Sequence, residues 1–117
     1  MKIVVNRCFG GYSLSTQAMN MYRELSGNPD PEFRYHHIER NDPIFVDIVE
    51  RLGEDASGPY GYLEVFEIPD GLSYEISEYD GLEDFITYLE VGVLDLINGF
   101  DGKMLELAQK ADYIKLI

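Results

Sequence analysis

The sequence predicts an α+β or α/β fold, in which helices pack on one face of a small mixed β-sheet that contains a hairpin over residues 62–79. Three observations support this prediction. An apolar run rich in β-branched residues opens the chain, two helical patterns follow with start and stop signals, and two strand patterns flank Pro69-Asp70-Gly71. The chain has 117 residues, the length of one ordinary domain. We therefore expect a single domain over 1–117, with residues 82–117 as a candidate C-terminal extension packed on it.

The first strand and the first helix are predicted from residues 2–26. The run from Lys2 to Cys8 has the apolar, β-branched composition of a buried strand. After a glycine turn, the Ser15 hydroxyl can accept hydrogen bonds from the free N–H groups of a first helical turn. Apolar residues then recur at helical spacing up to Gly27, so we expect a helix over Thr16–Ser26.

A second strand and a second helix are expected next. Residues 33–39, FRYHHIE, are rich in strand-forming residues and lie between two turn signals. Asp42 can cap a helix in which Pro43 occupies the first position, where the missing N–H of proline costs nothing. This helix is expected to end at Gly53, and residues 53–60 are typical of a loop.

The strongest strand patterns occupy residues 62–68 and 72–79, and the short loop between them predicts the hairpin. The second arm alternates apolar and polar residues, which indicates a sheet with one wet face. Residues 82–97 favour a helix, although ITYLEVGV is equally typical of a strand. A helix over 102–111 and an apolar tail over 113–117, able to pair with the sheet, complete the prediction.

Charge is segregated along the chain. The net charge is −13, and residues 52–102 contain 13 acidic side chains without a single Lys or Arg. Such a field repels nucleic acid and anionic membranes, and it attracts basic surfaces, including those of nucleic-acid-binding proteins. A purely solubilising acidic face is the ordinary alternative. No apolar segment is long enough to cross a bilayer, and a single cysteine suits a reducing compartment, so we expect a cytoplasmic protein.

The segment NRCFGGYSLST, residues 6–16, is the candidate for a small-ligand site. It lacks the lysine of a Walker loop, the G-x-G-x-x-G of a dinucleotide site and the arginine of a cysteine-phosphatase loop. A structural turn with a helix cap is the favoured interpretation. The alternative is a general anion site at the start of the helix, which would use Arg7, Gly10, Gly11, Ser13 and Ser15.

No catalytic or metal-binding constellation is evident. Cys8 could act as a nucleophile only with His36 or His37 as its base, and a single cysteine at a strand end is more often a small buried side chain. Two adjacent histidines on a strand point to opposite faces, which prevents them from binding one metal together. The carboxylates do not follow the order of a calcium loop. We therefore expect no enzyme activity, no cofactor and no metal.

Three motifs resemble a family of small proteins encoded by bacteriophages and prophages. The motifs are KIVVNRCFGGYSLS, RNDPIFVDIVERLGEDASG and LEVFEIPDGLSYEISEYDG, and they span residues 2–81 in the order typical of the family. The resemblance implies a phage or prophage origin and no assigned reaction. The sequence after Gly81 departs from the family pattern, so the resemblance does not extend to residues 82–117, and no catalytic residue is carried over.

From the charge segregation and the resemblance, we expect an acidic phage-type effector or inhibitor that binds a basic surface of a host protein, in an anti-defence or anti-CRISPR-like role. The alternatives are a small-ligand or nucleotide-binding module that uses residues 8–16, and a structural or homo-oligomeric phage protein. We expect neither direct nucleic-acid binding nor membrane binding. The candidate partner-binding residues are Glu64, Glu67, Asp70, Glu75, Glu78, Asp80, Glu83 and Asp84.

Overall fold

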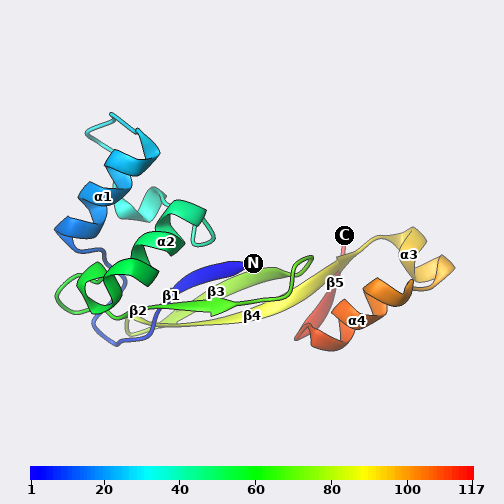
Figure 1. Cartoon of the computed structure of the whole chain (residues 1–117). Helices are drawn as coiled ribbons and strands as arrows, with labels where there is room; N and C mark the ends of the chain where they lie inside the picture. Colours follow the sequence, from blue (N-terminus) through cyan, green and yellow to red (C-terminus); the bar gives the residue numbers. More distant parts are fainter. The chain divides into compact units, whose positions relative to one another are not determined.

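The chain is a small α+β protein, and a computed structural model describes all of its 117 residues. It has four α-helices and two β-sheets (Figure 1). Short 3-10 helices lie at Tyr35–His37 and Gly53–Ala56. The other elements, in chain order, are β1 Lys2–Asn6, α1 Thr16–Ser26, α2 Pro43–Leu52, β2 Leu63–Glu67, β3 Ser73–Tyr79, β4 Leu82–Val91, α3 Val93–Asn98, α4 Gly102–Lys110 and β5 Tyr113–Leu116.

The chain forms two compact units that are interleaved in sequence. The N-terminal unit comprises residues 2–67 and 77–84. The C-terminal unit comprises Met1 and residues 68–76 and 85–117. Because the division falls within β3 and within β4, each of these strands contributes residues to both units.

The predicted limits of α1 and α2 are confirmed, because both helices begin at the capping residues that the sequence indicates. Ser15 Oγ accepts a hydrogen bond from the Ala18 N–H at 3.1 Å. Gly27 ends α1 with a φ of 68°, a conformation that glycine adopts without steric cost. The Asp42 carboxylate accepts hydrogen bonds from N–H groups of the first turn of α2, and Pro43 takes the first helical position.

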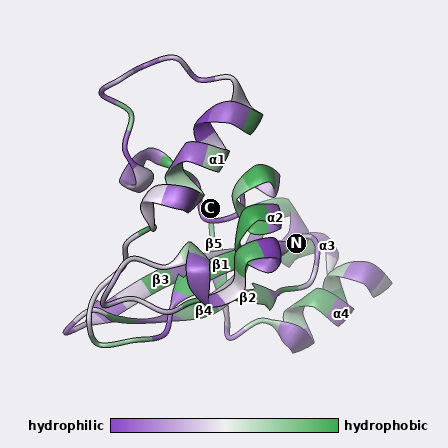
Figure 2. Ribbon diagram, turned by 60° about the vertical axis from the view of Figure 1, so that its left-hand side comes forward, coloured by the Kyte–Doolittle hydropathy of each residue, from purple (hydrophilic) through white to green (hydrophobic).

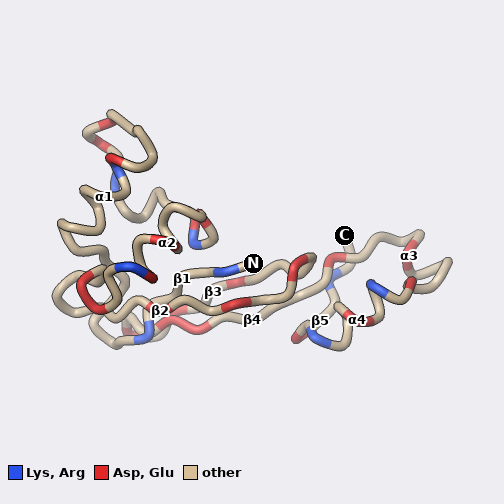
Figure 3. Tube along the Cα trace, viewed as in Figure 1, with Lys and Arg blue, Asp and Glu red and all other residues tan.

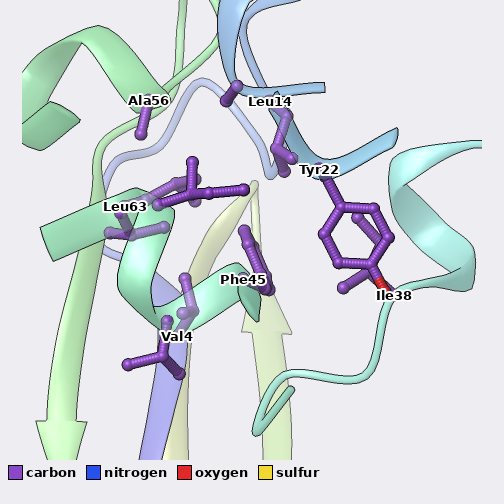
Figure 4. Close-up of a cluster of buried hydrophobic side chains, with 11 residues drawn as sticks. Val4, Leu14, Tyr22, Ile38, Phe45, Ala56 and Leu63 are labelled. Carbon is purple, nitrogen blue, oxygen red and sulfur yellow. The ribbon is translucent and has the colours of Figure 1, made fainter. Parts of the chain in front are cut away.

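The core of the N-terminal unit lies between α1, α2 and the two strands β1 and β2. These strands are antiparallel, with Val4 opposite Val65, and α2 packs on both of them and on α1. Figure 2 shows that α2 is largely hydrophobic, and its Phe45 and Ile48 are fully buried. Figure 4 shows the cluster around Phe45, which includes Tyr22 from α1. Each large apolar side chain buried here stabilises the fold by about 1.5–3 kcal/mol.

The edge of β1 that faces away from β2 is closed by residues distant in sequence. The Val4 N–H donates to the Arg40 carbonyl at 2.9 Å, and the Arg40 guanidinium donates to the Val4 carbonyl at 3.2 Å. Further along β1, the Asn6 N–H donates to the Glu83 carboxylate at 2.7 Å. Arg40 and Glu83 are themselves joined by two hydrogen bonds of 2.6 and 2.7 Å, which we call the Arg40–Glu83 pair. The pair therefore satisfies backbone groups that another strand would otherwise bind.

Tyr12 packs against the Arg40–Glu83 pair. The Arg40 guanidinium lies over the Tyr12 ring, 3.6 Å from its centroid. Burial raises the pKa of the Tyr12 hydroxyl far above its ordinary value, although the positive charge of Arg40 opposes the shift. The phenol therefore stays neutral, and the guanidinium is enclosed between an aromatic face and a carboxylate.

The C-terminal unit is built on a three-stranded sheet in the order β3-β4-β5. β5 is parallel to β4, with Leu116 opposite Val91. Only two residues connect β3 to β4, which requires these neighbours to be antiparallel. From α4, Met104 and Leu107 pack against the buried Leu89 and Val91. The predicted C-terminal helix and the pairing of the apolar tail with the sheet are confirmed.

The hairpin predicted over residues 62–79 is wrong in its pairing, although both strands exist. β2 pairs with β1, and β3 pairs with β4, in separate sheets. The tight turn of the real hairpin is Asp80-Gly81, whose φ angles of 49° and 89° suit the twist of the flanking strands. The Pro69-Asp70-Gly71 turn instead leads the chain from one sheet to the other.

The strand predicted over residues 33–39 is also wrong. Residues 35–37 form a 3-10 helix, and His37 Nδ1 accepts a hydrogen bond from the Arg34 N–H at 3.0 Å. This local side-chain contact stabilises a tight turn in place of an extended chain.

The helix favoured over residues 82–97 is wrong for most of its length. The segment forms β4 and then the short α3, which follows Gly92. Thr87, Leu89 and Val91 are buried and alternate with more exposed residues, which is the period of a strand.

Candidate functional site

Three turns of the N-terminal unit meet at close range. A Cβ atom on Gly10 would lie 1.7 Å from the Tyr60 carbonyl oxygen. A Cβ atom on Gly81 would lie 2.4 Å from the Phe9 carbonyl oxygen, and Gly81 has a φ of 89°. Only glycine permits these approaches. We call this place the loop junction, and it consists of residues 8–13, 58–61 and 80–81.

Asn6, at the end of β1, connects the three turns through its side chain. It is fully buried, and its side-chain amide donates to the carbonyls of Cys8 and Gly81, each at 2.8 Å. Its Oδ1 accepts from the Tyr62 N–H, also at 2.8 Å. The side chain of Asn6 thus binds a backbone group in the first turn, one in the third turn and one directly after the second turn. These hydrogen bonds hold the loop junction in a single geometry.

The loop junction and the residues beside it in β3 and β4 present large aromatic side chains and carboxylates to solvent. Tyr60 and Tyr79 are each 74% exposed, and Phe9 is 63% exposed. Glycine contacts bring the turns that carry them together, so these rings belong to one region of the N-terminal unit. We call this region the junction surface, and its members are Phe9, Tyr60, Tyr79, Glu78, Asp80 and Asp84.

The electrostatic character of the junction surface is negative. One cation, Arg7, lies 3.8 Å from an Asp84 carboxylate oxygen and donates to the Glu83 carbonyl at 2.5 Å. The Glu78 carboxylate accepts a hydrogen bond from the Gly81 N–H and so stabilises the turn while remaining exposed. Exposed tyrosines among carboxylates can stack on and hydrogen-bond the arginine and lysine side chains of another protein.

The eight predicted partner-binding acids do not share one environment. Glu78, Asp80 and Asp84 lie on the junction surface. Glu64 and Glu67 are exposed on β2 of the same unit (Figure 3).

Two more of these acids, Asp70 and Glu75, belong to the C-terminal unit and have partners there. Asp70 binds the amino-terminal ammonium group at 2.6 Å, and this hydrogen bond lowers the pKa of its carboxyl. Glu75 accepts from the Tyr113 hydroxyl at 2.7 Å, which raises the pKa of that phenol to about 12.

Glu83 is not a surface acid. Its residue is only 5% exposed, and its carboxylate is bound by Arg40 and by the Asn6 N–H. Its assignment to partner binding is therefore wrong. A buried carboxylate needs a counter-charge and hydrogen bonds, and the fold supplies both.

The residues predicted for the alternative ligand site have structural roles. Arg7 is directed to Glu83 and Asp84, as described above. The Ser15 hydroxyl donates to the Asp55 carbonyl at 2.6 Å and accepts from the helix. Ser13 Oγ lies 2.0 Å from the position that a Cβ atom on Gly58 would take, and Gly10 and Gly11 are part of the loop junction. These contacts favour the interpretation of the segment as a structural turn with a helix cap.

The histidines and the cysteine do not form a constellation. The Nδ1 atom of His37 is occupied by the Arg34 N–H, and the thiol of Cys8 is free and half-buried. Across the chain, no group of three or more His, Cys, Asp or Glu side chains could hold a metal ion. None of the helices combines the length and the apolar character that crossing a membrane requires. Searches of protein-family models, curated proteins and solved structures gave no match to the chain.

Proposed function

We propose that the protein is an acidic phage-type effector that binds a basic surface of a host protein in the host cytoplasm and competes there with nucleic acid. The charge segregation and the motif resemblance described above support an origin and a class of partner. The junction surface is the observation that carries the proposal, because it combines exposed aromatic rings with carboxylates on a rigid set of turns. Rigid aromatic anchors lose little entropy on binding, and tyrosine is enriched among residues that dominate interface energies.

The experiment has two stages. Tagged protein is first used to capture host proteins from lysate at low and moderate salt, and the captured proteins are identified by mass spectrometry. The affinity of the purified partner is then measured with and without its nucleic acid. The proposal expects binding that weakens as salt rises and that nucleic acid inhibits.

Matched variants locate the binding surface. Asp80→Asn with Asp84→Asn removes two charges from the junction surface, and asparagine tolerates the positive φ at position 80. Glu24→Gln with Glu32→Gln removes two exposed charges from elsewhere in the same unit. We expect the first pair to weaken partner binding by about tenfold or more and the second by less than about twofold. Equal effects of the two pairs would show that net charge alone acts and would overturn the assignment of the surface.

A third variant tests the aromatic component. Tyr79→Ser leaves the net charge unchanged and removes a ring that is 74% exposed. We expect it to weaken binding about tenfold or more, mainly through faster dissociation. If the affinity for the partner were unchanged, the Tyr79 ring would have no role in binding, and the interaction would depend on charge alone.

A further inference from the structure

The C-terminal unit carries a set of exposed aliphatic side chains. Helix α3 has no buried residue, and its Leu94 and Ile97 are 71% and 72% exposed. Strand β5 and the residue after it add three more exposed aliphatic side chains. We call this set the aliphatic surface, and its members are Val93, Leu94, Leu96, Ile97, Ile114, Leu116 and Ile117.

Backbone pairing places the two segments at the same end of the sheet. Leu116 is opposite Val91 in the β4–β5 pair, and the Ile117 N–H donates to the Val91 carbonyl at 2.9 Å. α3 begins two residues after Val91, at Val93. The end of β5 and the start of α3 therefore adjoin.

β5 is also an unprotected edge strand. It has β4 on one side and no strand on the other. Paired residues of parallel strands share a face, so Ile114 and Leu116 lie on the face of the buried Leu89 and Val91. Within the strand, Lys115 is the only charge, whereas natural edge strands that avoid pairing are usually protected by several charges, proline or a bulge.

We propose that the aliphatic surface and the open edge of β5 bind a second copy of this chain, through antiparallel pairing of the two β5 strands about a two-fold axis. This dimer is independent of the host-protein interaction proposed above, which uses the N-terminal unit. A two-fold axis perpendicular to the sheet does not exchange the two faces of the sheet, and directly opposed residues of paired strands share a face. The axis must therefore pass between a residue and the same residue of the second copy.

The sequence of β5 selects the register. With the axis at Ile114, the two Ile114 side chains meet, and each Lys115 lies opposite Tyr113 of the second copy. Within one chain, Lys115 Nζ already lies 5.3 Å from the centroid of the Tyr88 ring, so a lysine–tyrosine contact suits this face of the sheet. With the axis at Lys115, two lysines would be directly opposed, which is unfavourable.

The exposed area is sufficient for a dimer of ordinary size. The exposed fractions add to about four fully exposed aliphatic side chains, or roughly 400 Å² per copy at ~100 Å² each. Two copies thus supply about 800 Å², at the lower end of the roughly 800–1,300 Å² of apolar area in a standard homodimer interface.

Charge also favours this part of the molecule for self-association. Residues 102–117 carry Lys103, Lys110 and Lys115 against Glu106 and Asp112, whereas the chain as a whole has a net charge of −13. Electrostatic repulsion between two copies is therefore weaker at this segment than across the acidic residues 52–101. The one acid of α3, Asp95, accepts a hydrogen bond from the Gly92 N–H at 2.9 Å.

Analytical ultracentrifugation of the full chain tests the proposal between about 1 and 100 μM, where dimers of modest affinity dissociate. We expect a reversible dimer. Leu94→Glu with Ile97→Glu should raise the dissociation constant about 100-fold or more. Leu105→Glu with Gln109→Glu adds the same charge at exposed positions of α4 and should change it less than about threefold. A protein that stays monomeric at 100 μM would overturn the proposal, and the aliphatic surface would then have to bind a different protein. A dimer that both double variants weaken equally would also overturn it.

Cross-linking tests the register. In a Cys8→Ser background, Ile114→Cys should form a disulfide-linked dimer on mild oxidation, because directly opposed residues lie about 4.5–5.5 Å apart between Cα atoms. Lys115→Cys places the thiols away from each other and should cross-link at least tenfold more slowly. Faster cross-linking of the Lys115→Cys variant would overturn the proposed pairing of β5.

Discussion

Replacing Glu83 by glutamine is expected to destabilise the N-terminal unit strongly while keeping the side-chain shape. The Glu83 side chain is 7% exposed, and it accepts from both terminal nitrogens of Arg40 and from the Asn6 N–H. Glutamine retains one acceptor oxygen, but its amide nitrogen would oppose a donor. Breaking a buried ion pair by removing one partner costs about 3–5 kcal/mol. Because Arg40 is 19% exposed and keeps its contact with Val4, we expect a loss of about 3 kcal/mol.

Urea denaturation followed by far-ultraviolet circular dichroism measures this loss. A total stability of about 5–15 kcal/mol is typical of a natural domain, so the midpoint should fall clearly. Glu64→Gln, an exposed acid on β2, is the matched control and should change the stability by less than about 0.5 kcal/mol.

A double variant separates charge from packing. Arg40→Met with Glu83→Leu removes both charges and should lose less than Glu83→Gln, because no buried charge is left without a counter-charge. If Glu83→Gln cost under about 1 kcal/mol, the Arg40–Glu83 pair would not close the edge of β1 as described, and the reasoning would be refuted.

Three other substitutions probe a turn, the start of α4 and the core. Gly81→Ala should cost about 2–3 kcal/mol, because its Cβ would lie 2.4 Å from a carbonyl oxygen at a φ of 89°; Gly102→Ala, in open space, should gain about 0.5–1 kcal/mol in the same urea titration. Burial and a hydrogen bond to Asp42 raise the pKa of Tyr22 to about 12 from an ordinary value of 10.0. The unfolded chain therefore ionises first, so this contribution to stability is complete below pH 10 and is lost as the pH rises to 12. Tyr22→Phe should flatten the stability curve over that interval, and an unchanged slope would contradict the role of this phenol.

Local signals were sufficient to predict α1, α2 and α4 from the sequence. Ser15, Asp42 and Pro43 define helix starts through hydrogen bonds made within a few residues, so their effect does not depend on the rest of the fold. The pairing of strands depends on distant residues and was predicted less well. Asp80-Gly81 is a strong hairpin signal, but the apolar residues after it fit a helical period as well as an alternating one.

The candidate site was predicted only in part, for a similar reason. Sequence shows that residues 52–102 are acidic, but not that Glu83 is buried, since its partner Arg40 is 43 residues away. Exposure of Phe9 follows from the glycines that hold its turn against two others, which is a property of the assembled fold. No sequence pattern within any one of the three turns predicts that the turns approach one another.

The interleaving of the two units has a consequence for the order in which the chain folds. The edge of β1 receives its last partner from Glu83, and residues 77–84 fall, in sequence order, between residues 68–76 and 85–117 of the C-terminal unit. During synthesis, the first 67 residues can form α1, α2 and the β1–β2 pair while the Asn6 N–H still lacks the Glu83 carboxylate. The N-terminal unit is therefore complete only after β3 and β4, which also belong to the C-terminal unit, have been synthesised. No contiguous fragment contains either unit alone.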